Sequence, residues 1–501
     1  MTSFLDLPDD LRVEISEHMD YVSVLRLSSC CKSLQSTVSG SSALQYKIAL
    51  GLNFMTDGGS QMSLAELLAL LNDRWSAWQK LQWKSETVIK IPGLCNAYEL
   101  VAGVFAMSGA GALTVVRLPS TYGGKLQIVK QELEIPIRDF AIDPTQDLVA
   151  ILEDNQIALP WNQHRIVQLH FRSVSSNKPH SNAALPFVTF EVMADAFTNN
   201  RIFSAEMQLA DCLVSVFLCR GRASHAPRAL VWNWKTGALI YDSNANNPIG
   251  WPNSIHDFSF IDANSFVCTS RDKSGQIHIY TFPESPKHRA TYIGTLNLPD
   301  IFSMRKVFGL TVHSSPYHAN APLHAPFTPS DDGIVHCFSV LYVNKNDDAP
   351  QDLTRYNMFI RRSTLLKFVQ EHKQKGQCII HSWDSWGPAN CRFLPRSDPR
   401  TWLRYIHGHR FVRASMDTDG VDVLEFNTET KSSLLPCESD GLRQHHGRDK
   451  PTIINRNDVF CGDVVSSLPY QVLSRAIPEN FYAYMIDQEH VIGLKVRKHR
   501  S

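Results

Sequence analysis

The spacing of apolar residues divides this chain into two parts. In the first ~85 residues, apolar side chains recur every three or four positions, which indicates amphipathic helices. Beyond residue 88 they fall in short runs separated by Asp, Asn, Gly or Pro, which is typical of strands joined by turns. We therefore expect an α+β multidomain protein, in which a small all-α domain precedes a large all-β domain.

Three short helices are predicted before residue 51. The first opens at Pro8, because proline suits the first helical position and the acidic residues Asp9 and Asp10 lie at the positive end of the helix dipole. A second helix is expected over residues 21–34 and a third over residues 43–50. The apolar stripe of the first helix consists of Leu7, Leu11, Ile15 and Met19.

A fourth helix is predicted at about residues 63–83. Ser63 and Glu66 have the spacing of a capping box, and leucines and tryptophans continue behind them with helical period. We expect domain boundaries at residues 1–50 for the helical domain, 51–88 for a linker that contains this helix, and 89–501 for the β domain.

Residues 89–501 contain repeated strand–turn–strand patterns and no comparably long amphipathic helix. Residues 140–152 and 258–268 each place an aspartate turn between two apolar runs, and Leu230–Tyr241 resembles the strand and turn that end a WD-repeat blade. Propeller repeats take about 40–50 residues each, so we expect an irregular β-propeller with seven or eight blades. Proline-rich residues 316–332 are predicted to form its longest loop.

Charge and cysteine content restrict the class of protein. The 49 Lys and Arg residues balance the 49 Asp and Glu residues, so no net field attracts nucleic acid, and no nucleic-acid partner is expected. The cysteines form no C-x-x-C pair, which favours a reduced intracellular location, in the cytoplasm or nucleus. The uncharged residues 100–116 are rich in glycine and are predicted to form a hairpin, so no membrane association is expected.

The N-terminus resembles the F-box motif. The resemblance lies in Phe4-Leu-Asp-Leu-Pro-Asp-Asp-Leu-Arg-Val-Glu-Ile-Ser-Glu-His-Met-Asp, followed by Val24-Leu-Arg-Leu-Ser-Ser-Cys-Cys-Lys-Ser-Leu. It covers residues ~4–48, and a unit of this size is too small to bury a self-sufficient core. The positions that match the motif are Leu7, Pro8, Leu11, Ile15, Met19, Val24, Leu25, Leu27, Cys31 and Leu34.

This resemblance implies a function. F-box domains dock on the Skp-type adaptor of a cullin-RING ubiquitin ligase, so the chain is expected to recruit an unknown protein substrate and to perform no chemistry itself. The matching positions are then the expected adaptor-binding residues. The sequence departs from the motif at Asp10, Arg12, Ser16, Cys30 and Gln45, which puts the strength of docking in doubt.

Two other readings stay open. The N-terminal helices could cap the core of a propeller scaffold that has no ligase role, or the propeller channel could hold an enzyme site. The sequence contains none of the common hydrolase, nucleotide-binding, metalloprotease or kinase motifs. His407 and His409 lack further ligands at metal-binding spacing. We therefore predict no catalytic residue, no metal and no cofactor.

A basic cluster in the β domain is the candidate substrate-binding site. Arginine side chains suit phosphate recognition, so this cluster could bind a phosphorylated target. The alternative is that these residues lie on solvated strands and pair with carboxylates such as Asp398 and Asp417. The cluster consists of Arg396, Arg400, Arg404, Arg410 and Arg413.

Overall fold

The fold was analysed in a computed structural model. It describes residues 4–91, 95–109, 111–153, 164–193, 197–198, 201–202, 204–218, 227–245, 251–252, 254–283, 289–317, 320–321, 325–346, 353–396, 404–416, 419–428, 442–445, 450–479 and 481–495. No helix in these ranges is long and apolar enough to cross a membrane.

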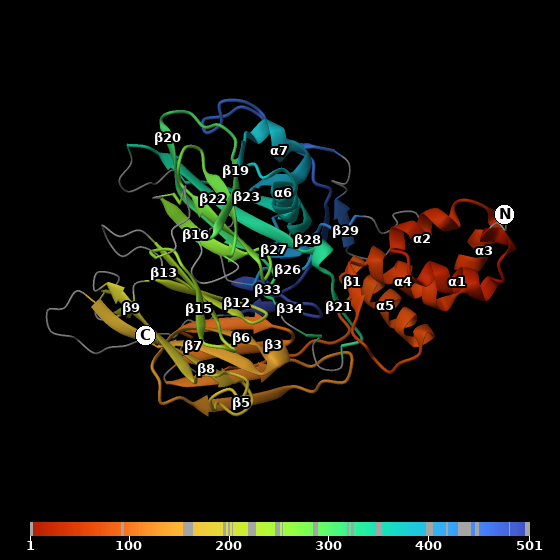
Figure 1. The fold of residues 1–501 in the computed structure, drawn as a ribbon, viewed down its shortest axis with the longest axis horizontal. Coiled ribbons are helices and arrows are strands. Elements are labelled where there is room, and N and C mark those ends of the chain that lie inside the picture. Colours follow the sequence, from red (N-terminus) through yellow and green to blue (C-terminus); the bar gives the residue numbers. More distant parts are fainter. Residues whose placement is uncertain are drawn as a thin grey trace.

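Helices dominate the first 80 residues, and two further α-helices, α6 and α7, lie in the β domain. They are η1 (Phe4–Asp6), α1 (Asp9–Glu17), α2 (Tyr21–Ser28), α3 (Lys32–Gly40), α4 (Ser42–Leu52), α5 (Leu64–Gln79), α6 (Arg362–Lys375) and α7 (Trp383–Asn390), with short 3-10 turns at η2 (Pro144–Gln146) and η4 (Asp331–Gly333). In Figure 1, α1–α5 project from one side of the β domain.

The single helix predicted over residues 21–34 is wrong, because the chain breaks between α2 and α3. The hydroxyl groups of Ser28 and Ser29 donate to the Leu25 carbonyl at 2.7 and 3.0 Å. Such local bonds compete with helix propagation. Cys31 is then fully extended, with φ −161° and ψ 163°, and is the N-cap of α3. The chain can therefore turn and pack α3 against α2.

The capping box predicted for the fourth helix is confirmed. The Glu66 backbone N–H donates to the Ser63 hydroxyl at 3.3 Å, and the Ser63 N–H donates to the Glu66 carboxylate at 2.9 Å. These two bonds satisfy N–H groups that a helix start leaves without partners. Helix α5 therefore begins where the sequence predicts it.

The β domain contains six antiparallel sheets of four or five strands among the described residues. Their strands are β2 (Ala97–Val101), β3 (Val104–Gly109), β4 (Ala112–Arg117) and β5 (Gln127–Glu132); β6 (Ile137–Asp143), β7 (Leu148–Glu153), β8 (His164–Ser173) and β9 (Phe187–Met193); β12 (Ala205–Ala210), β13 (Leu213–Leu218), β14 (Arg228–Asn233) and β15 (Ala238–Asp242); β16 (Ile255–Phe260), β17 (Ser265–Ser270), β18 (Gln276–Thr281), β19 (Thr291–Asn297) and a parallel β24 (Ile379–His381); β20 (Arg305–His313), β22 (Val335–Asn344), β23 (Thr354–Arg361) and β25 (Cys391–Pro395); β26 (Ile406–His407), β27 (Arg410–Ala414), β28 (Gly420–Glu425), β32 (Gln471–Ala476) and β29 (Leu442–His445).

Four short hairpins or strand pairs complete the β structure. They are β1 (Met55–Asp57) with β21 (Phe327–Pro329), β10 (Phe197–Thr198) with β11 (Arg201–Ile202), β30 (Thr452–Ile454) with β31 (Val464–Ser466), and β33 (Ala483–Ile486) with β34 (Val491–Leu494).

The sheets are arranged as a β-propeller. The first strands of consecutive sheets, β2, β6, β12, β16 and β20, are neighbours in that order, and the remaining strands of each sheet follow outward. Apolar side chains fill the space between sheets, as Phe217, Tyr241, Phe258 and Phe266 do between the third and the fourth. The predicted fold class is thus confirmed.

The described residues form six large sheets, where seven or eight blades were expected. The expectation assumed even repeats, whereas the fifth sheet carries an insertion between its third and fourth strands, β23 and β25. Residues 362–390 form α6, β24 and α7 there, which corrects the prediction that no long helix follows residue 88. Leu365 and Val369 of α6 are buried against the sheets. The helix was missed because its mean hydropathy is low and its apolar stripe is narrow.

The turn between β33 and β34 closes the ring. The His490 Nε2 lies 2.8 Å from the Pro119 carbonyl, and the Glu489 carboxylate accepts from the Ser120 and Thr121 hydroxyls at 3.0 Å. The Gln488 side chain donates to the Phe327 carbonyl at 2.9 Å. The C-terminal hairpin therefore joins the first sheet to the segment that follows β20.

Candidate functional site

The N-terminal helices present an apolar surface. Leu5, Leu11 and Ile15 are 47%, 44% and 45% exposed, and Pro8 between them is also exposed. Leu11 and Ile15 are four residues apart on α1 and therefore share one face of that helix. A small domain that leaves three large aliphatic side chains in water has a surface suited to a protein partner.

Two polar residues of α1 lie on the side of the helix that is turned toward the bundle. Arg12 and Ser16 are buried, at 9% and 1% exposure. The Arg12 guanidinium donates to the Ser33 hydroxyl at 2.9 Å and also pairs with Asp9. The Ser16 hydroxyl donates to the Arg12 carbonyl at 2.7 Å. These two departures from the motif therefore place hydrogen-bonded polar side chains on the bundle side of α1, although the buried Arg12 Nε has no partner among the described residues, and they leave Leu11 and Ile15 exposed.

The ten predicted docking residues divide between the surface and the core of the bundle. Pro8, Leu11 and Ile15 are exposed; Leu7, Met19, Leu25, Leu27 and Cys31 are half-buried; Val24 and Leu34 are buried. A partner can reach the first two groups, whereas Val24 and Leu34 stabilise the bundle from within. Sequence reasoning did not include Leu5 and Val22, which are also exposed. Leu5 could have been found from its position beside the stripe.

The bundle has its own small core and a separate joint to the β domain. Val24, Val38, Leu44 and Ile48 form the core. The main contacts of α1, α2 and α3 are with one another and with α4, and α4 then contacts α5 and β1. The apolar surface of η1 and α1 is therefore not used to cover the propeller (Figure 1).

The joint is built from backbone pairing and from α5. Strand β1 pairs with β21, with Met55 opposite Pro329, and the Gly58 N–H donates to the Pro326 carbonyl at 2.9 Å. A Cβ atom at Gly58 would lie only 2.3 Å from the Ala325 carbonyl oxygen, so this close approach requires glycine. The predicted proline-rich loop thus contributes an edge strand that holds the linker.

Helix α5 packs on the sixth sheet and on the closing turn. The guanidinium of Arg410 lies 4.3 Å from the ring of Trp78, and the Arg74 Nη2 donates to the Gln488 carbonyl at 2.7 Å. Burial, together with the nearby charge of Arg410, lowers the pKa of Arg74 to about 10. The linker helix is therefore an integral part of the β domain's surface.

The predicted arginine cluster is largely paired within the protein. Arg410 pairs with Glu425 at 2.8 Å and Arg413 with Asp422 at 3.3 Å, while Arg404 forms a two-bond pair with Glu99. Arg396 ends β25, where its backbone N–H donates to the Arg355 carbonyl, and Arg400 lies outside the described residues. Phosphate binding by this cluster stays a prediction, and a ligand would have to compete with three carboxylates.

Carboxyl groups from four consecutive first strands gather at the axis of the propeller. Glu99, Asp139 and Glu206 line a cavity there, and Asp257 is hydrogen-bonded to Glu206. Burial raises the pKa of Asp139 to about 7 and raises the pKa of Glu206 and of Asp257, the last also because Glu206 is close.

These axial carboxyl groups join the sheets. Asp257 accepts from the Phe258 and Val312 N–H groups, both at 2.7 Å, and thereby bridges the fourth and fifth sheets. The pair of Arg404 and Glu99 likewise connects the entry to the sixth sheet with the first sheet. The contacts of Asp257 and Glu99 therefore hold neighbouring sheets together.

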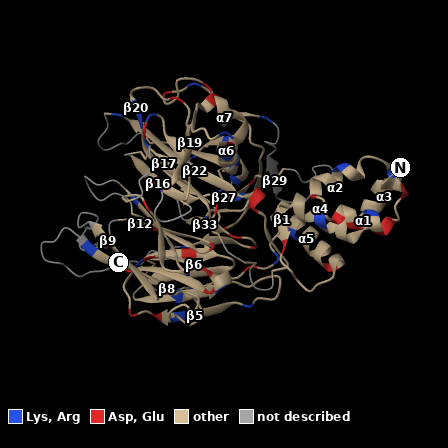
Figure 2. Ribbon diagram, viewed as in Figure 1, with Lys and Arg blue, Asp and Glu red and all other residues tan. Residues whose placement is uncertain are grey.

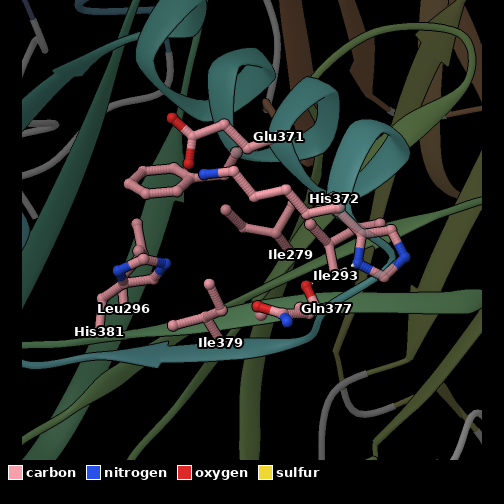
Figure 3. Close-up of a pocket in the computed structure, with 11 residues that line it drawn as sticks. Ile279, Ile293, Leu296, Glu371, His372, Gln377, Ile379 and His381 are labelled. Carbon is pink, nitrogen blue, oxygen red and sulfur yellow. Dashed lines mark hydrogen bonds between the residues drawn. The ribbon is translucent and has the colours of Figure 1, made fainter.

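A second pocket lies between α6 and β24. Figure 3 shows Glu371 and His372 on the helix side and Ile379 and His381 on the strand side. The His372 Nδ1 lies 3.0 Å from the Gln377 carbonyl, and the ring of His381 lies 4.8 Å from that of Phe368. These contacts orient the two histidine rings within the pocket.

In the part of the chain that the structure describes, no group of three His, Cys, Asp or Glu side chains lies close enough together to hold a metal ion.

Lys and Arg side chains are interspersed with Asp and Glu side chains over the β domain (Figure 2).

Comparison with known proteins agrees with the helical domain. The family model of the F-box domain matches residues 4–44, so the chain carries an N-terminal F-box domain. A search of curated proteins gave no match.

Several solved structures show a low level of similarity to this chain. Hsv2 of Kluyveromyces marxianus aligns with 8% identity over 64% of this chain and 78% of its own, at a TM-score of 0.27. AztD of Citrobacter koseri aligns with 8% identity over 68% and 82%, also at 0.27. The WD40 β-propeller domain of Doa1 aligns with 11% identity over 79% and 97%, at 0.28. The fold assignment rests on the order of the sheets described above.

Proposed function

We propose that this chain is the substrate-recognition subunit of a Skp–cullin–F-box ubiquitin ligase. Its F-box would bind the Skp-type adaptor, its β domain would hold a target protein, and other subunits would transfer ubiquitin. The observation that carries the proposal is the exposed apolar surface formed by Leu5, Leu11 and Ile15 within the matched domain.

The joint between the two domains supports this role. A receptor has to hold its target at a fixed place relative to the ligase. The pairing of β1 with β21 and the packing of α5 on the sixth sheet fix the F-box relative to the propeller. The scaffold alternative, in which the helices cap the propeller, is not favoured, since α1–α3 pack mainly among themselves and on α4.

Co-expression with a Skp-type adaptor and a tagged cullin tests the proposal. The wild-type chain is expected to co-purify with the cullin only when the adaptor is present. Ile15→Lys should abolish co-purification, because it places a charge in the apolar contact. Leu64→Lys is the matched control, since Leu64 is 38% exposed but lies on α5, outside the F-box. Co-purification of Ile15→Lys at the wild-type level would refute the proposal.

A further inference from the structure

Two neighbouring first strands carry β-bulges at the same end of the propeller. The pairing of β20 shifts between Val307 and Gly309, and that of β16 shifts between Ile255 and Asp257. The extra residues are Phe308 and His256. The His256 ring lies 3.6 Å from the place where a Cβ atom on Gly309 would sit, so the two bulges are in contact. Bulges commonly redirect side chains at functional surfaces.

The bulge in β20 places large apolar side chains in solvent. Phe308 is 46% exposed, although Val307 and Leu310 on either side of the bulge are buried. Met304, just before β20, is 65% exposed, and its carbonyl accepts from the Lys345 N–H at 2.7 Å. A phenylalanine and a methionine exposed on one strand are the residue types that partner proteins cover.

Cationic residues contact the backbone beside Phe308 and Met304. The Arg271 Nη1 donates to the Phe308 carbonyl at 3.4 Å, and the Lys306 Nζ donates to the Lys345 carbonyl at 3.0 Å. Among the described residues at this end, Asp272 is next to Arg271 in the chain, and Asp458 is held by Arg305. Arg271, Lys306 and Lys345 together with Met304 and Phe308 are named the β20 patch.

The neighbouring histidine adds no charge to this surface. Burial lowers the pKa of His256 to about 4, and the charge of Arg271 acts in the same direction. His256 is therefore neutral at physiological pH, and the positive charge of the β20 patch belongs to its arginine and lysines.

The β20 patch lies far from the F-box. Phe308 lies five residues before His313, the last residue of β20, after which the chain leads to β21 and the linker. Five residues of strand span roughly 17 Å. In Figure 1 the β20 end is on the opposite side of the β domain from α1–α5. A partner on the patch would leave the F-box surface free.

We propose that the β20 patch binds a segment of a partner protein in which acidic side chains flank a large apolar side chain. The apolar side chain would cover Phe308 and Met304, and the acidic groups would pair with Arg271, Lys306 and Lys345. This inference rests on the proposed function, because it names the chemistry of the target that the receptor would hold.

Fluorescence polarisation with the full-length chain tests this inference. The probe is a short labelled peptide with a Leu-Phe pair between two runs of Glu, and its counterpart has Lys in place of every Glu. The acidic peptide is expected to bind about tenfold more tightly than the basic one, and more weakly as salt rises. Phe308→Asp and Lys306→Glu should each weaken binding about tenfold.

The control variant is Leu239→Asp, which changes a 40% exposed leucine on β15 and should leave binding unchanged. The inference is overturned if neither peptide binds, if both bind equally, or if Phe308→Asp binds like the wild type. Each variant is also tested for adaptor capture. If the wild-type chain captures the adaptor but binds neither peptide, only the inference about the β20 patch is refuted. If the wild-type chain does not capture the adaptor, the proposed function is refuted.

Discussion

The ring of Phe54 lies 5.7 Å from the imidazole of His409, at an interplanar angle of 55°. Phe54 lies between α4 and β1, and His409 lies in the turn between β26 and β27. The Arg361 guanidinium lies 5.3 Å from the same phenyl ring, which is only 6% exposed. One side chain of the linker that follows the F-box is thus inserted into the propeller.

Replacing Phe54 should loosen the joint between the domains. Phe54→Ala removes a buried ring and is expected to lower the free energy of unfolding by about 3 kcal/mol. We also expect faster proteolysis within residues 53–62, since the contact that anchors them is lost. Limited proteolysis and urea unfolding measure both effects. Val88→Ala, at an 80% exposed position, is the control, and equal behaviour of the two variants would contradict this role of Phe54.

The pair of Arg404 and Glu99 is expected to stabilise the closed ring. Glu99 is 4% and Arg404 17% exposed in their side chains, so removing one partner leaves the other charge buried. Arg404→Met should therefore cost about 3 kcal/mol, and adding Glu99→Met should recover part of that loss. Urea unfolding of both single variants and the double variant measures the coupling. If the loss in free energy of unfolding of the double variant equals the sum of the losses of the two single variants, Arg404 and Glu99 are not coupled.

The closing turn should make stability depend on pH. Burial alone would lower the pKa of His490, but the charge and hydrogen bonds of Asp487, with the Pro119 carbonyl, raise it to about 9. Because the pKa of His490 is higher in the folded state than its value of about 6.5 in the unfolded state, protonation of His490 stabilises the folded state. This contribution is complete below pH 6.5 and is lost as the pH rises through 9. The expected size is at most about 3 kcal/mol.

Thermal unfolding of the wild type and of His490→Gln between pH 6 and 9.5 tests this expectation. The wild type should be the more stable at pH 6, and the difference should shrink toward pH 9.5, because only the wild type loses the charged pair. Other titrating groups are common to both proteins and cancel in the difference. A difference that stays constant across this range would mean that folding does not raise the pKa of His490.

The capping box should stabilise the first turn of α5. Ser63→Ala removes the side-chain acceptor for the Glu66 N–H and is expected to cost about 1 kcal/mol. Amide hydrogen exchange of residues 64–67 should accelerate, since the first turn frays more easily. Ser85→Ala, at an exposed position after α5, provides the comparison. Unchanged exchange in Ser63→Ala would contradict the assigned cap.

Some of this architecture could be predicted from sequence because it depends on local signals. The start of α1 at Asp9, one residue after the predicted Pro8, and the cap at Ser63 are set by residues within one helical turn. The break between α2 and α3 was missed because hydroxyl groups of Ser28 and Ser29 that bond backward leave the apolar period intact. Periodicity alone does not show such a break.

The orientation of α1 and the partners of the arginines depend on distant residues. Leu11 faces solvent because Arg12 finds Ser33 on another helix, and Arg404 meets Glu99, 305 positions away. No local pattern encodes either contact. The same limit applies to Phe308, whose exposure comes from a bulge in the register of β20 against β22.

Calorimetric titration of a purified Skp-type adaptor into the full-length chain tests the central claim most directly. The account predicts wild-type binding with a Kd below about 1 µM, and a loss of at least about 100-fold for Leu11→Lys combined with Ile15→Lys, while Leu64→Lys binds like the wild type. Absence of binding by a folded wild-type chain, or equal affinity of the double variant, would contradict the account.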